Sequence, residues 1–396
     1  MTMFEPQDPE FLADPYPAFD ALRAVGEVHD HPGLGMAVAV SHSACSAVLR
    51  HRGLGRVWSD VKPVEQFAAV NLLHRNSLLE SEPPKHTRLR RLIAGAFARG
   101  HVERLRPWVA ELAGRLVDGL AEKIEAGDSA DLLVEVAGPL PVEVIAELLG
   151  VPGPDRALLQ PWSNAIVKLY EYGLPPQTRE AAERAAAEFV AYLRELIALR
   201  RRQPGSDLVS DLVAETDTDG ARLTEDELVA TAVLLLMAGH EASVNVVGNG
   251  VLALMRHRDQ WQRLVEDPAL LPTAVEELIR FDSPLQLFER TAATEVEIAG
   301  HVVKPGEKIA ALLGAAARDP LVFDSPGTLD VGRSPNAHLG FGAGIHYCVG
   351  APLARLEIGA TLSALTRRLP TAQLAETPAR RAEFVIRGLR SLHLTS

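Results

Sequence analysis

One short stretch of the chain combines residue types that together can hold a metal ion. Residues 338–355 read His-Leu-Gly-Phe-Gly-Ala-Gly-Ile-His-Tyr-Cys-Val-Gly-Ala-Pro-Leu-Ala-Arg, so a cysteine separates a glycine-rich loop from an apolar stretch with helical spacing. Pro352 suits the first turn of that helix, and a helix N-terminus favours the thiolate form of a nearby cysteine. Glycines let the backbone approach a flat group closely. This pattern indicates an iron ligand, and cysteine-ligated haem is a known arrangement of that kind.

The competing interpretation is that Cys348 is an ordinary small buried residue. That is the usual role of an isolated cysteine, and we expect Cys45 to have it. Cys348 differs because Phe341, Gly344 and Gly350 surround it in the pattern Phe-x-x-Gly-x-x-x-Cys-x-Gly. The pattern resembles the haem-binding loop of the cytochrome P-450 family. The resemblance implies that Cys348 is the axial metal ligand and that Phe341 and Gly350 help to bind the cofactor, haem b.

Composition restricts the class of protein. The chain has 396 residues, 47% hydrophobic and 23% charged, as in globular proteins that bury a large core. Its formal net charge of −12 argues against general binding of nucleic acid or anionic membranes. Two distant cysteines give neither a disulfide framework nor a zinc spacing, and the apolar run at 228–239 is too short to span a bilayer. We expect a cytoplasmic protein with no nucleic-acid or membrane partner.

A second candidate site lies where two prolines precede a helical pattern. The segment 81–93 places His86 and Arg90 one turn apart on one helical face. The pair is either part of a solvated basic surface or an anion-binding site. It resembles the family segment Pro-Pro-x-His-x-x-x-Arg, whose His and Arg hold a haem propionate. The same resemblance assigns Arg290 and His346 to the propionates.

A long helix is predicted from Leu228 to about His257. Residues 224–227, Thr-Glu-Asp-Glu, form a capping-box signature, and the helix is apolar almost all round, as in a helix that crosses a core. Gly239 and Glu241 in its middle are costly for a buried helix. Either a neighbouring polar group satisfies the carboxylate, or the segment is a kinked oxygen-binding groove with a proton-relaying acid.

This segment resembles the family sequence Ala-Gly-x-Glu/Asp-Thr, with one departure. Ala242 stands where the family usually has a threonine, and Ser243 follows it. The resemblance places Glu241, Ala242 and Ser243 at the catalytic centre, without the usual alcohol that helps to deliver protons. One possibility is that Ser243, an ordered water or a substrate hydroxyl replaces that alcohol, and of these we favour the water or the substrate. The other possibility is that the chemistry is not routine hydroxylation.

Glu277 and Arg280 are spaced to pair along a helix, a common surface arrangement worth a few tenths of a kcal/mol. The family has a Glu-x-x-Arg pair completed by an arginine before the haem loop, and Arg333 occupies that position. The resemblance implies that these three residues are structural and not catalytic.

The resemblance covers the chain from Asp14 to the tail. It implies a mostly α-helical fold with small β-sheets, and a single haem domain over residues 1–396 with no fused reductase or ferredoxin. The haem would lie between the long central helix and the cysteine loop. The residues implied to line the substrate pocket are Phe67, Val70, Leu72, Leu235, Ala238, Leu285, Leu287 and Ile386. We also predict an irregular segment at 53–79, a hairpin at 296–306 and a strand-and-turn tail at 384–389.

The implied activity is insertion of one oxygen atom from O2 into a C–H bond of an apolar small molecule, by hydroxylation or epoxidation. The substrate class is a secondary metabolite such as a polyketide, terpenoid or steroid. Electrons would come from a ferredoxin and its reductase, docked on Arg88, Arg91, Arg99 and Arg355 unless these form an ordinary solvated surface. Ala242 prompts one alternative, a peroxide-dependent or oxidative-coupling enzyme; a haem sensor without turnover is another.

Overall fold

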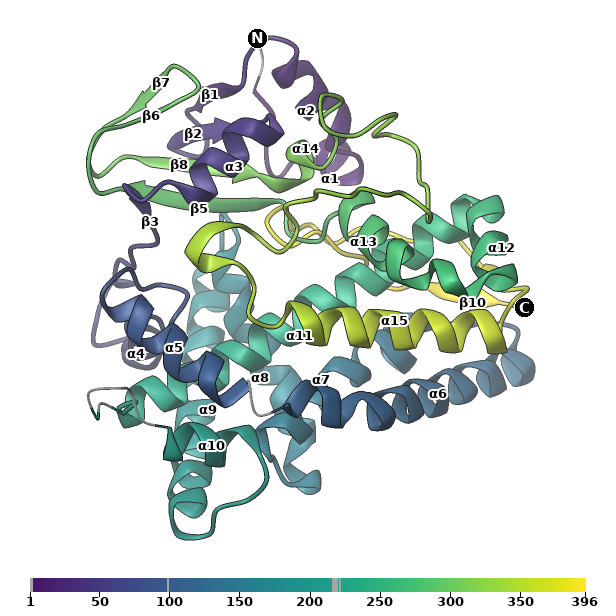
Figure 1. Ribbon diagram of the computed structural model, residues 1–396, viewed down its shortest axis with the longest axis horizontal. Coiled ribbons are helices and arrows are strands. Elements are labelled where there is room, and N and C mark those ends of the chain that lie inside the picture. Colours follow the sequence, from purple (N-terminus) through teal and green to yellow (C-terminus); the bar gives the residue numbers. More distant parts are fainter. Residues whose placement is uncertain (1–2, 98–99, 216–219, 221) are drawn as a thin grey trace. The chain divides into compact units, whose positions relative to one another are not determined.

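The computed structural model describes residues 3–97, 100–215, 220 and 222–396. The chain forms two compact units. The first unit comprises Met1–Gly55, Ala110–Pro139 and Ala242–Ser396, and the second comprises Arg56–Val109 and Leu140–Glu241. Helices dominate and the sheets are small (Figure 1), which confirms the predicted fold class. The assignment of one haem domain to residues 1–396 stays a prediction.

The first unit contains the strands and the helices at both ends of the chain. Its strands are β1 (Val28–His31), β2 (Met36–Ala39), β3 (Leu54–Gly55), β4 (Ala130–Asp131), β5 (Leu287–Ala292), β6 (Val296–Ile298), β7 (His301–Val303), β8 (Lys308–Leu312), β9 (Gln373–Leu374) and β10 (His393–Thr395). Its helices are α1 (Pro9–Ala13), α2 (Tyr16–Arg23), α3 (His42–Arg50), η1 (Leu133–Ala137), α12 (Arg258–Glu266), η4 (Pro268–Leu270), α13 (Leu271–Phe281), α14 (Leu313–Ala316), η5 (Gly344–His346) and α15 (Ala351–Arg368).

The largest sheet has the strand order β1-β2-β8-β5-β3. β2 pairs with β8 in parallel, and β8 pairs with β5 in antiparallel register with Ile309 opposite Arg290. α3 lies along this sheet (Figure 1). The two smaller sheets are β4-β10-β9 and the hairpin β6-β7. Ala299 and Gly300 form the hairpin turn with φ of 48° and 80°, as a two-residue turn requires, and confirm the predicted hairpin.

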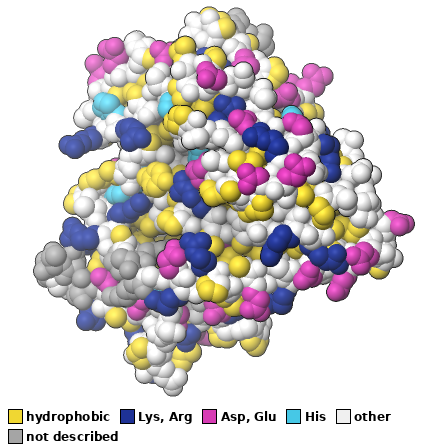
Figure 2. All heavy atoms as spheres, turned by 45° about the vertical axis from the view of Figure 1, so that its right-hand side comes forward, with side chains coloured by type: hydrophobic (Ala, Val, Ile, Leu, Met, Phe, Trp, Pro, Cys, Tyr) yellow, Lys and Arg dark blue, Asp and Glu magenta, His cyan; other side chains and the backbone are white. Residues whose placement is uncertain are grey.

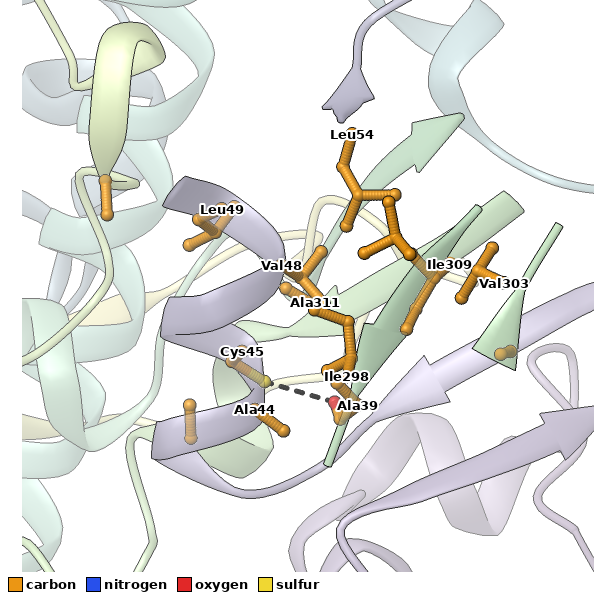
Figure 3. Packing of buried hydrophobic residues seen from close by; sticks show 14 of the residues in the cluster. Ala39, Ala44, Cys45, Val48, Leu49, Leu54, Ile298, Val303, Ile309 and Ala311 are labelled. Atoms are coloured by element: carbon orange, nitrogen blue, oxygen red, sulfur yellow. Dashed lines mark hydrogen bonds between the residues drawn. The ribbon is translucent and has the colours of Figure 1, made fainter. Parts of the chain in front are cut away.

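Cys45 belongs to the core between α3 and this sheet. Figure 3 shows its side chain among apolar residues, with the Sγ atom donating to the carbonyl oxygen of Ala39 over 3.1 Å. Burial raises the pKa of the Cys45 thiol well above its usual range. Ser41 caps α3 by accepting from the backbone N–H of Ala44. Cys45 is therefore the inert core residue that the sequence predicts.

The second unit is built from helices. Those within it are α4 (Ala68–Arg75), α5 (Lys85–Phe97), η2 (Gly153–Leu158), α8 (Leu159–Val167), η3 (Lys168–Tyr170), α9 (Pro176–Arg202) and α10 (Leu208–Ala214), together with α7 (Pro139–Leu149) apart from its first residue. Two helices, α6 (His101–Gly127) and α11 (Glu225–Arg256), begin in the second unit and end in the first.

Helix α4 corrects the prediction of an irregular segment at 53–79. Its N-terminus has no side-chain cap from the preceding residue. Instead, the two carboxylate oxygens of Glu183 on α9 accept from the backbone N–H groups of Ala69 and Val70, each over 2.9 Å. Because a residue more than a hundred positions away satisfies these donors, local sequence gives no start signal.

Helix α11 begins with the predicted capping box. The N–H of Thr224 donates to Glu227 over 2.9 Å, and the N–H of Glu227 donates to the Thr224 hydroxyl over 3.2 Å. Arg88 of α5 forms an ion pair with Glu227. The helix is long and apolar enough to cross a membrane, but 72% of its most apolar window is buried inside the structure, as in a core helix.

Candidate functional site

Cys348 lies in the first unit between η5 and the N-terminus of α15. Its backbone N–H donates to the carbonyl oxygen of Phe341 over 2.9 Å, which closes the loop. Gly342 and Gly344 both have a φ of 69°, a conformation that favours glycine. A Cβ atom on Gly344 would lie 2.6 Å from the carbonyl oxygen of Leu49 in α3. The glycines therefore allow the tight turn and the close packing of this loop against α3.

The environments of the two cysteines differ. The Cys348 side chain is partly exposed, whereas Cys45 is fully buried. Cys348 precedes Ala351, the first residue of α15, and Pro352 lies in the first turn of that helix. The positive end of the helix dipole therefore lies beside an accessible thiol. This is the setting in which a cysteine can bind a metal as thiolate.

A charged network fixes the Phe341 ring in this loop. The Arg355 guanidinium lies over the ring, 4.4 Å from its centroid. Arg355 also donates to both carboxylate oxygens of Glu276, over 2.6 and 2.9 Å, and His338 contacts the same carboxylate at 3.1 Å. Burial opposes the charged form, but the hydrogen bonds from Arg355 and His338 prevail and lower the pKa of Glu276 to about 2. Phe341 is thus held from one side by a paired cation.

The candidate anion-binding residues occur in both units. Arg290 is buried on β5, where it donates to the carbonyl oxygen of Glu289 over 2.9 Å, and His346 ends η5 half-buried. In the second unit, His86 is buried and Arg90 is half-buried one turn further along α5. Buried histidine and arginine side chains are suited to carboxylates such as propionates. Their role as propionate ligands stays a prediction.

The middle of α11 presents small residues. Ala238 is exposed, and Gly239 and Ala242 are half-buried, although the helix around them is buried. A Cβ atom on Gly239 would lie 2.8 Å from Cδ1 of Ile145, so the glycine also serves the packing of α7. Helix α11 continues through these residues without a break. Small side chains at these positions would let a flat group approach the helix closely.

Glu241 and Ser243 lie on either side of Ala242 and are both buried. A carboxylate oxygen of Glu241 lies 3.9 Å from Nδ1 of the adjacent His240. The Ser243 hydroxyl donates to Oε2 of Glu357 on α15 over 3.0 Å. Ser243 is therefore engaged by an acidic partner that the sequence-based interpretation missed.

Glu357 is a buried carboxyl group on the helix that follows Cys348. Burial raises its pKa to about 8, and the hydrogen bond from Ser243 lowers it by a smaller amount. Its second oxygen, Oε1, is buried and has no hydrogen-bond partner among the described residues. Glu357 is therefore protonated near neutral pH. One sequence feature could have indicated this buried carboxyl group: Glu357 lies between Leu356 and Ile358 on an apolar stretch of the helix.

The structure brings Glu277, Arg280 and Arg333 together in the first unit. Glu277 accepts from Arg280 over 2.7 and 2.8 Å and from Arg333 over 3.1 Å. The side chains of Glu277 and Arg280 are fully buried. Glu277 also accepts from the backbone N–H of Asp330 and from Asn336. The carboxylate thus holds the segment that leads into the cysteine loop.

Two of the predicted pocket residues in the first unit lie opposite each other. Leu285 and Ile386 form an isolated antiparallel bridge, and Leu287 begins β5 nearby. The tail at 384–389 forms isolated bridges and bends here in place of the predicted strand and turn. The other pocket candidates lie on or beside helices of the second unit, Phe67, Val70 and Leu72 at α4 and Leu235 and Ala238 on α11.

Comparison with known proteins gives one consistent family. The sequence model described as cytochrome P450 matches residues 158–377. The chain is 41% identical over 393 residues to cytochrome P450 monooxygenase PikC of Streptomyces venezuelae. The alignment covers 97% of this chain and 91% of PikC. It is 36% identical to the polyketide biosynthesis cytochrome P450 PksS of Bacillus subtilis (strain 168), covering 98% of each. Its structure is similar to that of P450BioI in complex with an acyl carrier protein ligated to hexadec-9Z-enoic acid, with a TM-score of 0.92, 33% identity and coverage of 98% and 99%.

Proposed function

Because the chain belongs to the cytochrome P450 family, whose members are haem b enzymes, we propose that it oxygenates an apolar secondary metabolite of the polyketide type. The reaction class is monooxygenation, in which one atom of O2 enters a C–H bond or a double bond. A polyketide is favoured over a terpenoid or steroid because a relative aligned over nearly the whole chain, PksS, carries polyketide biosynthesis in its name. The observation that carries the proposal is the accessible Cys348 in a loop shaped by glycines.

The residues present fit haem. Cys348 offers an accessible thiol at a helix N-terminus, and Ala238, Gly239 and Ala242 offer a small-residue surface on α11. Bound haem supplies the activation of O2, and a cysteine thiolate favours cleavage of the O–O bond. Cys348 would bind the iron, and the residues proposed to hold the two propionates are His86, Arg90, Arg290 and His346.

Ser243 and Glu357 provide a proton route that does not need a threonine at position 242. Glu357 is protonated near neutral pH, and its hydrogen bond from Ser243 links it to the helix that carries Glu241 and Ala242. We propose that Glu357 stores a proton and gives it to the Ser243 oxygen when the Ser243 hydroxyl turns and passes its own proton toward the catalytic centre. Glu241 is a second buried acid on the same helix. Ordered water or a substrate hydroxyl would complete the route.

We expect Glu357→Gln and Ser243→Ala each to lower the rate of substrate oxygenation about tenfold, since each removes one member of a proton relay. The double variant should be no slower than the slower single variant, because both residues act in one route. Coupled turnover measured as product formed per O2 consumed checks this. Additive losses would show that Ser243 and Glu357 act independently.

Protonation of Glu357 also affects stability, independently of activity. Its pKa in the folded state, about 8, lies above the ordinary value of 4.5, so the folded protein binds a proton more tightly than the unfolded chain. The stability that this tighter proton binding contributes is fully present below about pH 4.5 and is lost as the pH rises to about 8. Glu357→Gln should remove this pH dependence. The free energy of unfolding of the variant should therefore rise relative to that of the parent protein between pH 5 and pH 8. Urea unfolding at several pH values measures the difference, and parallel pH curves would show that Glu357 is ionised throughout.

We propose that an acidic ferredoxin, which its reductase keeps reduced, delivers the electrons in the cytoplasm. Of the predicted docking residues, Arg88 is paired with Glu227 and Arg355 with Glu276, and Arg99 lies outside the described residues. Arg91 is exposed on α5. Acidic and basic side chains are interspersed on the face that Figure 2 shows, which favours a local docking patch over a broad basic field.

The end of α3 offers such a patch beside the cysteine loop. Arg50, His51 and Arg52 are exposed there, and a Cβ atom on Gly344 would lie 3.2 Å from the Cα atom of Arg50. In the same cysteine loop, Tyr347 is 41% exposed. Exposed basic side chains suit an acidic partner.

We expect Arg50→Glu combined with Arg52→Glu to slow reduction by ferredoxin about tenfold at low salt, because electrostatic steering is reversed. The difference should shrink at high salt. Arg202→Glu combined with Arg256→Glu changes the net charge equally at other exposed positions and serves as the control. Stopped-flow reduction measures the rate; equal slowing in both double variants would assign the effect to net charge alone.

Turnover with isotopically labelled O2 tests the proposed function itself. Product carrying one labelled oxygen atom, formed only with reduced ferredoxin, supports monooxygenation. Product formed with hydrogen peroxide and without ferredoxin would favour the peroxide-dependent alternative. A coupled product that contains no new oxygen would favour oxidative coupling, and tight ligand binding without any product would favour a sensor.

A further inference from the structure

Two asparagines on α11 bind two consecutive arginines of the C-terminal segment. Asn245 accepts from Arg381 over 2.6 Å, and one helical turn further along, Asn249 accepts from Arg380 over 2.5 Å. We call these four residues the brace. Both asparagines are buried, so the two hydrogen bonds lie in a setting where loss of a partner is costly.

The brace holds the base of residues 380–389, which we call the tail loop. Arg380 and Leu389 form a bridge across its base, and the N–H of Arg381 donates to the carbonyl oxygen of Gly388 over 3.1 Å. A Cβ atom on Gly388 would lie 2.1 Å from Oδ1 of Asn245. Gly388 is therefore needed for the tail loop to approach α11 this closely.

The tip of the tail loop is held by a different part of the first unit. The N–H of Gln286 donates to the carbonyl oxygen of Val385 over 3.0 Å, and the N–H of Arg387 donates to that of Pro284 over 2.7 Å. Ile386 lies between these bonds, opposite Leu285. The position of Ile386 therefore depends on α11 at the base of the loop and on residues 284–286 at its tip.

Each asparagine–arginine pair forms one rung of the brace, and both rungs have further contacts. Arg380 also pairs with Asp282, and Asn249 also donates to the carbonyl oxygens of Asp282 and Arg387, so this rung belongs to a larger buried network. In the other rung, Arg381 lies 3.3 Å from Glu383 within the tail loop itself. The Asn245–Arg381 rung thus links α11 directly to the tail loop itself.

We propose that the Asn245–Arg381 rung is a positioning device that sets substrate specificity by fixing Ile386 relative to α11. Asn245 follows Ser243 by two residues, so the helix that carries the proton relay also anchors the loop that carries Ile386. The inference rests on the proposed function and on the predicted role of Ile386 as a pocket residue that contacts the bound substrate. Neither Asn245 nor Arg381 needs to touch the substrate.

The test measures binding selectivity in the haem-loaded protein. Dissociation constants are determined from the change in haem absorption on addition of a macrolactone, a steroid and hexadec-9Z-enoic acid, with imidazole as a small haem ligand. We expect Asn245→Ala and Arg381→Ala each to change the ratio of the two lowest dissociation constants about tenfold in the same direction. The double variant should change this ratio no further. Imidazole affinity should stay unchanged.

Two matched variants separate positioning from a general loss of structure. Asn245→Asp keeps an oxygen acceptor for Arg381 and should retain the parent selectivity. Arg390→Ala removes an exposed arginine at the end of the same segment and should have no effect. Unchanged ratios in Asn245→Ala and Arg381→Ala, with lowered thermal midpoints only, would overturn the inference. Failure of the parent protein itself to bind any of the three apolar probes would instead contradict the proposed function, and the inference with it.

Discussion

Replacing Cys348 with serine is expected to abolish substrate oxygenation. A serine hydroxyl at this position does not ionise near neutral pH, so the variant lacks the thiolate that favours O–O cleavage. We expect product formation to fall below detection and the thiolate-type absorption of the reduced, carbon monoxide-treated protein to disappear. Helical circular dichroism should persist, because the backbone contact of Cys348 with Phe341 uses no side-chain atom.

Cys45→Ala is the matched control for this prediction. Cys45 is fully buried and donates its thiol to the carbonyl oxygen of Ala39. Its loss should cost roughly 1 kcal/mol of stability through a small cavity, with oxygenation and the absorption spectrum preserved. Oxygenation by Cys348→Ser, or its loss in Cys45→Ala, would contradict the assignment of Cys348 as the metal ligand.

Replacing Glu277 with alanine is expected to lower the free energy of unfolding by about 3–5 kcal/mol. The substitution leaves the Arg280 guanidinium fully buried without its carboxylate, and it removes the acceptor for Arg333 and for the N–H of Asp330. Chemical denaturation followed by circular dichroism measures the loss. Haem occupancy should fall as well, since the released segment leads into the cysteine loop.

The chain contains a second glutamate–arginine pair with the same spacing in an exposed setting. Glu103 and Arg106 lie 3.0 Å apart with side chains 70% and 57% exposed, whereas those of Glu277 and Arg280 are 0% exposed. Glu103→Ala should leave the free energy of unfolding almost unchanged, because exposed pairs are solvated in both states. If the two variants lose similar stability, burial does not determine the effect at Glu277.

Features with a local signal were predictable from sequence. The capping box at Thr224 and Glu227 is encoded within four residues and forms as predicted, although α11 begins at Glu225 and not at the predicted Leu228. The cysteine loop carries its own glycines, and the β6-β7 hairpin carries its own turn. In each case the residues that satisfy the backbone lie next to the element that they define.

Features that depend on distant partners were not predictable in this way. Helix α4 is capped by Glu183 of α9, so the sequence around residue 68 contains no start signal. Glu357 gains its raised pKa from burial, and the periodicity of α15 does not reveal its contact with Ser243. The Asn245–Arg381 rung likewise joins residues more than a hundred positions apart.

The most direct test of the account is the absorption spectrum of the purified protein after haem loading, reduction and addition of carbon monoxide. The account predicts a strongly red-shifted Soret band of the thiolate type, because it assigns Cys348 as the residue that would bind the haem iron. A Soret band at the position typical of histidine-ligated haem, or no haem uptake at all, would contradict it.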